Sequence, residues 1–111
     1  MKPTNLVIAA LLAATPAAAD CGTIIQPSAP YDHPLAYDPT IHIMDYFAID
    51  GFCRKLGVVA RTDRRVEACN DPRTRTIYLP RVSPELSQCY FRHEVGHLEG
   101  WPGNHPGGTY Q

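Results

Sequence analysis

Two histidines and a glutamate lie within five consecutive residues near the end of the chain: His93, Glu94 and His97. Residues four apart lie on the same face of a helix, so both imidazoles can reach one metal ion. Glu94 follows the first histidine directly and would face the position that such a site leaves open for water. Zinc lowers the pKa of that water, and a carboxylate can then take its proton and pass it to a leaving amine. The spacing therefore predicts a hydrolytic site with one zinc ion and Glu94 as the catalytic residue.

A site of this kind needs a third protein ligand, and His105 is the expected one. The Pro102-Gly103 pair predicts a tight turn that could bring His105 back over the helix. Glu99 is the main alternative, although its position six residues after His93 places it on a different helical face. An aspartate from elsewhere in the chain is a further alternative for the third ligand. The alternative to any metal site is a pair of ordinary surface histidines.

The helix that would carry these residues has clear start and stop signals. Ser83 is a good N-cap and Pro84 suits the first helical position. Gly100 can end the helix in the left-handed conformation, so we expect a helix from Pro84 to Leu98 or Glu99. Residues 101–111 are rich in glycine and proline and should form a closing loop.

A second helix is predicted for residues 46–56, where apolar side chains recur at three- and four-residue spacing. Asp45 can cap its start and Gly57 can end it. Three short runs rich in β-branched, aromatic or small apolar residues predict strands, with a turn at residues 70–73. These runs are residues 58–60, 65–69 and 74–79. Together the elements predict a single α+β domain with a short antiparallel or mixed sheet.

The N-terminal residues have the three-part pattern of a secretory signal peptide. Lys2 gives a basic start, Leu6 to Ala14 form an uncharged apolar run, and Ala17 to Ala19 form a small-residue cleavage site. The apolar run is too short to span a bilayer, which disfavours a membrane anchor. We therefore expect residues 1–19 to be removed, and residues 20–111 to act in the periplasm or outside the cell without stable membrane insertion.

All four cysteines lie after the predicted cleavage site, which favours two disulfides in an exported chain. They are Cys21, Cys53, Cys69 and Cys89. Three pairings are possible, and their wide spacing argues against a four-cysteine zinc site. Residues 20–45 are rich in proline, which predicts an extended arm across the domain, tied down by Cys21.

Overall charge gives little indication of a charged partner. Charged residues make up 19% of the chain and the formal net charge is −1. Arginines are frequent between residues 61 and 92, but no nucleic-acid recognition motif accompanies them. A solvated basic face is the simpler interpretation, and we expect no nucleic-acid partner. The oligomeric state is left open.

The run HEVGHLEG, residues 93–100, resembles the zincin metallopeptidases. It matches the H-E-x-x-H-x-x-G part of the metzincin signature. Gly103 stands where metzincins place their third ligand, His105 comes two residues later, and Met44 precedes the motif, so there is no methionine turn. The chain is thus more similar to a minimal zincin with a variant third ligand, as in small exported bacterial metallopeptidase-like proteins.

The resemblance implies a zincin-like α+β domain with a peptide or protein substrate. Zincins place an edge strand above the active-site helix, where an extended substrate can pair. The segment TIYLP, residues 76–80, takes that position in chain order and gives Ile77 and Tyr78 as expected substrate-binding residues.

The function expected from the sequence is that of an exported zinc-dependent metallopeptidase. One alternative is a non-catalytic module of the cell envelope that binds zinc and a peptide, which the small size favours. Another is a zinc amidase that acts on cell-wall peptides. The presence of Glu94 favours catalysis, because a structural zinc needs no general base.

Overall fold

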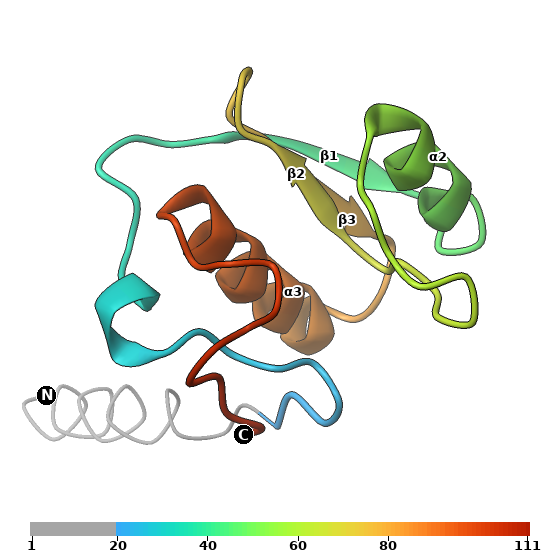
Figure 1. Cartoon of the computed structure of the whole chain (residues 1–111). Coiled ribbons are helices and arrows are strands. Elements are labelled where there is room, and N and C mark those ends of the chain that lie inside the picture. Colours follow the sequence, from blue (N-terminus) through green and yellow to red (C-terminus); the bar gives the residue numbers. More distant parts are fainter. Residues whose placement is uncertain (1–19) are drawn as a thin grey trace, which may run out of the picture.

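The computed structural model describes residues 20–111, and the predicted signal peptide, residues 1–19, lies outside this part (Figure 1). Two helices lie on either side of a small three-stranded sheet, which confirms the prediction of an α+β fold. Within residues 20–111 no helix has the length and apolar character needed to cross a membrane.

The sheet has the strand order β1-β3-β2 and is mixed. Its central strand β3, Thr76–Pro80, pairs in parallel with β1, Thr40–Met44. On its other side β3 pairs antiparallel with β2, Cys69–Asp71, across the turn at residues 72–75. Because both edges of β3 are occupied, the expectation that this segment is an edge strand is wrong.

Two strand predictions and the prediction of an arm differ from the structure. Residues 58–60 form no strand, and the predicted strand at 65–69 begins only at Cys69. The strand β1 occupies the end of the stretch expected to be an arm, residues 20–45. Four of the five side chains of β1 are exposed, so the strand shows no alternation of buried and exposed side chains and depends on backbone pairing with β3.

Side chains alternate along β3 and divide the core into two parts. Ile77 and Leu79 pack toward α3, Pro84–Leu98, whereas Tyr78 packs on the opposite face. On that face lies α2, Ile49–Leu56. This alternation follows from the two-residue period of a strand.

The bounds of α3 agree with the sequence prediction. The Ser83 hydroxyl accepts a hydrogen bond from the Leu86 N–H at 3.3 Å, and Pro84 is the first helical residue. Gly100 has a φ of +104°, the left-handed conformation that ends the helix. The helix therefore brings His93, Glu94 and His97 to its last turns.

The second helix, α2, starts three residues later than predicted. The Asp45 carboxylate accepts a hydrogen bond from the Phe47 N–H at 2.9 Å, which forms a separate turn before the helix. Gly57, with a φ of +114°, ends the helix as expected. Its buried face carries Ile49 and Cys53.

The N-terminal segment, residues 21–28, lies against both α3 and the C-terminal tail (Figure 1). The backbone N–H of Cys21 donates to Gln111 O at 2.6 Å, and Gln26 forms a bridge with Thr109. A short 3₁₀ turn, Ala29–Tyr31, follows this segment. The first part of the expected arm therefore packs closely against the body.

Two disulfides are present, as predicted. Cys21 pairs with Cys89 and joins the N-terminal segment to α3. Cys53 pairs with Cys69 and joins α2 to β2. The first bridge thus lies on the α3 side of the sheet, and the second ties α2 to the sheet itself.

Candidate metal centre

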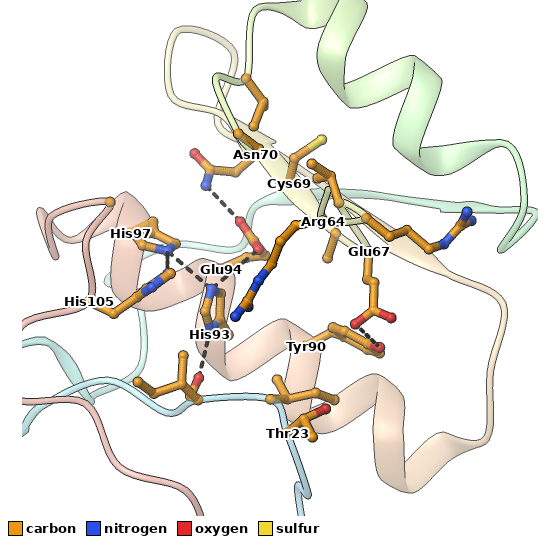
Figure 2. A pocket seen from close by; sticks show the side chains of 18 of the residues that line it. Thr23, Arg64, Glu67, Cys69, Asn70, Tyr90, His93, Glu94, His97 and His105 are labelled. Carbon is orange, nitrogen blue, oxygen red and sulfur yellow. Dashed lines mark hydrogen bonds and ion pairs between the residues drawn. The ribbon is translucent and has the colours of Figure 1, made fainter. Parts of the chain in front are cut away.

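Three histidine side chains converge at the C-terminal end of α3 (Figure 2). The Nε2 atom of His97 lies 3.1 Å from Nε2 of His93 and 3.1 Å from Nε2 of His105. All three ligand atoms lie within 4.8 Å of one another, close enough to hold one metal ion. The structure thus brings together the three residues that the sequence predicted as ligands.

Backbone carbonyls fix the orientation of two of these rings. The Nδ1 atom of His93 lies 2.6 Å from Ile25 O, and the Nδ1 atom of His97 lies 2.8 Å from Trp101 O. A carbonyl can only accept a hydrogen bond, so each Nδ1 carries the proton when the ring is neutral. Both Nε2 atoms then direct lone pairs at each other, and a shared cation would remove that repulsion.

The spacing of these atoms fits a tetrahedral metal site. Zinc–nitrogen bonds of about 2.0–2.1 Å in tetrahedral geometry place two nitrogens about 3.3 Å apart. The observed 3.1 Å from Nε2 of His97 to Nε2 of His93 and to Nε2 of His105 is close to this value. Three nitrogen ligands would leave one coordination position open.

His105 reaches the cluster through a tight turn. Its backbone N–H donates to Pro102 O at 2.9 Å, and its φ is +59°, in the left-handed region. Glu99, the alternative ligand, lies elsewhere, with its carboxylate 3.4 Å from the ring of exposed His33. The structure therefore favours His105 over Glu99 as the third ligand.

Burial keeps the three imidazoles in the form that binds metals. Desolvation lowers the pKa values of His93 and His97 below the ordinary value. Desolvation, with the charges of the two neighbouring histidines, lowers the pKa of His105 to about 4. All three rings are therefore neutral at pH 7, and a metal ion does not have to displace protons.

The Glu94 carboxylate is buried beside the histidines, with an exposed fraction of 4%. One oxygen accepts a hydrogen bond from Asn70 Nδ2 at 2.8 Å, and the other lies 3.9 Å from Nε2 of His93. Burial raises the pKa of Glu94, while the Asn70 bond and the charge of His97 act in the opposite direction. A carboxylate in this environment accepts a proton more readily than one in water.

Asn70 was expected only as part of a turn and had no signal of a role in the site. It lies in β2, and its side chain meets Glu94 because α3 packs beside that strand. The role of the Ile25 carbonyl has no sequence signature either, because every residue carries a backbone carbonyl. Both contacts depend on tertiary packing that no local pattern reveals.

Trp101 packs against all three histidines with an exposed fraction of 2%. Its ring stacks on His97 at 4.9 Å between centroids and lies within 5.2 Å of His93 and 4.8 Å of His105. Its indole N–H donates to Pro106 O at 3.0 Å. Trp101 is the only tryptophan in the chain, so its fluorescence can report on metal binding at the cluster.

A cavity of about 610 Å³ opens beside the histidines (Figure 2). Its walls come from residues 23–25, from residues 58–61 and 64–70, from α3 and from the closing loop after α3. This volume lies within the range of about 300–1,000 Å³ that is typical of ligand-binding pockets. The cavity therefore has room for several residues of a peptide or for a small molecule.

The two expected substrate-binding residues lie away from this cavity. Ile77 is fully buried in the core against α3, and Tyr78 packs on Phe52 on the other side of the sheet. Neither lines the cavity, because β3 is the central strand.

Gly96 lets the N-terminal segment approach α3. A Cβ atom there would lie 2.5 Å from Cγ of Pro27 and 3.2 Å from the Trp101 ring. We expect Gly96→Ala to lower the free energy of unfolding by about 1–3 kcal/mol, the usual effect of overpacking. Gly51→Ala in α2 is the control, because a Cβ there meets no atom within 4 Å, and it should stabilise the fold by about 0.5–1 kcal/mol. Urea unfolding of both variants checks this, and equal effects would contradict the close contact.

Comparison with known protein families, with curated proteins and with solved structures found no match for this chain.

Proposed function

We propose that this protein is an exported zinc-dependent peptidase. The observation that carries the proposal is the convergence of three Nε2 atoms beside the buried Glu94 carboxylate. A metal site with a purely structural role has its ligands but no need of a buried carboxylate directed at it. The resemblance of HEVGHLEG to the zincin motif supports the same function.

Zinc is the ion that suits three neutral imidazoles with one open position. When bound there, it would supply a water of lowered pKa and polarise a substrate carbonyl. The protein's own contribution begins with the carbonyls of Ile25 and Trp101, which hold two of the rings in one orientation.

Glu94 is the general base and acid in the proposed reaction. Asn70 fixes one of its oxygens, and the other is left toward the histidines. In this position Glu94 can take a proton from the attacking water and later pass it to the amine that leaves.

The open edge of β2 offers a binding surface for an extended peptide. The Thr40 N–H donates a hydrogen bond to Arg75 O, and the Arg81 N–H donates one to Met44 O. The backbone N–H and C=O groups of the odd-numbered residues of β3 therefore point toward β1. The backbone groups of the even-numbered residues of β3 then point toward β2, where Tyr78 pairs with Cys69. Backbone groups alternate along a strand, so those of Asn70 point to the open edge, beside the cavity.

Export agrees with two disulfides, which persist in oxidising compartments. The same interpretation assigns residues 1–19 to a signal peptide and places the protein in the periplasm or outside the cell. Detection of a mature N-terminus at Asp20 in a secreted or periplasmic fraction tests this part of the proposal.

Metal binding is tested with the purified protein after chelation. Zinc should bind in one-to-one stoichiometry and change the fluorescence of Trp101, which contacts all three ligands. His105→Asn should weaken zinc binding by at least about 100-fold, since mutation of a residue that only hydrogen-bonds to a metal ligand already costs about 10–100-fold. Asparagine is the suitable replacement because it tolerates the left-handed φ of +59°. Unchanged affinity in this variant would place the third ligand elsewhere.

Hydrolysis is tested with a library of unstructured peptides. The zinc-loaded protein should cleave them, EDTA should abolish cleavage, and zinc should restore it. Cleavage of purified cell-wall peptides and no protein-derived peptide would instead favour the amidase. Zinc-dependent peptide binding without cleavage of either substrate would favour the non-catalytic module.

A further inference from the structure

One arginine of the cavity beside the histidines has no partner for its guanidinium group among residues 20–111. Arg64 lines this cavity, and Figure 2 shows its side chain directed toward His93 and Glu94. Among residues 20–111 no carboxylate forms an ion pair with Arg64, and its hydrogen bonds involve only its backbone. Its guanidinium group is therefore available to a ligand.

The other charged groups of the cavity are already engaged. Arg61 forms an ion pair with Asp63 at 2.5 Å, and the Arg65 guanidinium lies 4.4 Å from the centre of the Tyr46 ring. The Glu67 carboxylate accepts hydrogen bonds from the hydroxyls of Tyr46, at 2.7 Å, and Tyr90, at 3.0 Å.

Asn70 donates to the remaining carboxylate of the cavity wall, that of Glu94. Among residues 20–111, Arg64 is thus the arginine of this wall whose guanidinium contacts neither a carboxylate nor an aromatic ring.

The loop that carries Arg64 is held by a residue of α2. The Arg54 guanidinium donates hydrogen bonds to three carbonyls of this loop: Ala60 O at 3.2 Å, Arg61 O at 3.0 Å and Arg64 O at 2.5 Å. Asp50, one turn earlier in α2, forms an ion pair with Arg54 at 3.0 Å. The backbone of Arg64 is therefore fixed, and only its side chain adapts to a ligand.

We infer that Arg64 binds a carboxylate of the substrate, which makes this a peptidase that favours peptides with an acidic group near the cleaved bond. This inference rests on the proposed function of the metal centre. The planar guanidinium forms paired hydrogen bonds with a carboxylate, whereas Arg61 and Arg65, the other arginines of the cavity, already have partners in Asp63 and Tyr46. The carboxylate can belong to an aspartate or glutamate side chain or to the C-terminus of the peptide.

The experiment uses peptides that differ in one charge. One pair contains aspartate or asparagine at the same position, scanned on both sides of the cleaved bond, and a second pair ends in a free acid or an amide. The zinc-loaded protein should cleave the acidic member of one pair with a kcat/KM about tenfold higher, as expected for a charge-assisted contact at an exposed arginine. The pair that shows the difference identifies the source of the carboxylate.

Two variants assign this preference to a residue. In Arg64→Gln the ratio of kcat/KM between acidic and neutral peptides should fall to about one, since the charged donor is lost. Arg61→Gln is the matched control, with the same change of charge in the same loop, and it should keep the ratio because Asp63 already neutralises Arg61. No preference in the wild type, or a preference that survives in Arg64→Gln, would overturn the inference.

Binding to the zinc-loaded Glu94→Gln variant separates this inference from the proposed function. If no peptide is cleaved by the wild type, the peptidase proposal fails, and the affinities of the acidic and neutral peptides still decide the role of Arg64. Tighter binding of the acidic peptide that is lost on Arg64→Gln supports the inference, and equal affinities overturn it.

Discussion

Glu94→Gln is expected to reduce turnover about a thousandfold while the protein still binds one zinc ion, because general acid–base catalysis contributes about 10²–10⁴-fold. Glutamine has the shape of glutamate and can still accept the hydrogen bond from Asn70 through its amide oxygen. It cannot take a proton from water. Loss of turnover with retained zinc would therefore come from the missing base.

The control for this variant is Glu99→Gln, the same substitution five residues later, at the C-terminal end of α3. Glu99 lies near exposed His33, away from the three ligands, so this change should alter kcat by less than about twofold. Metal content, urea unfolding and kcat are measured for both variants. Substantial activity in Glu94→Gln would show that another group activates the water, and the proposed mechanism would then be wrong.

The ends of α3 and the ligand spacing were predictable because they depend on local chemistry. Ser83, Pro84 and Gly100 are found where capping, first-turn and left-handed residues belong, and the helix follows those signals. The four-residue spacing then places His93 and His97 on one face without further information.

The parts that sequence reasoning missed depend on contacts between distant residues. The strand β1 follows a proline-rich stretch, which hid the alternation of Ile41 and Ile43 with polar residues, and its partner strand β3 is far away in the sequence. That pairing makes β3 central, and β2 becomes the edge strand beside the cavity. The expectation that residues 76–80 form an edge strand came from the resemblance to zincins and from chain order, and the strand order contradicts it.

Removal of the Cys21–Cys89 disulfide is expected to lower the free energy of unfolding by about 4 kcal/mol, because it closes a long loop in the unfolded chain. The two cysteines are 68 residues apart, against 16 for Cys53–Cys69. The shorter loop corresponds to about 3 kcal/mol on the same chain-entropy argument. Urea unfolding of the two double alanine variants, each measured without metal, checks this order.

Removal of the two disulfides should differ more in its effect on zinc affinity than in its effect on the free energy of unfolding. The Cys21–Cys89 bridge ties to α3 the segment whose Ile25 carbonyl orients the His93 ring. Once this segment is released, Nδ1 of His93 loses its partner, and we expect zinc to bind about 10–100-fold more weakly in Cys21→Ala/Cys89→Ala. The Cys53–Cys69 bridge supports no carbonyl of this kind.

Cys53→Ala/Cys69→Ala should therefore bind zinc with wild-type affinity while it is folded. Trp101 fluorescence titrations at low temperature, where circular dichroism shows both variants to be folded, measure the two affinities. Equal affinities would show that the N-terminal segment stays in place without its bridge. A selective loss in the Cys21→Ala/Cys89→Ala variant would mean that oxidation of one cysteine pair completes the metal centre. Metal loading would then follow disulfide formation in the maturation of the protein.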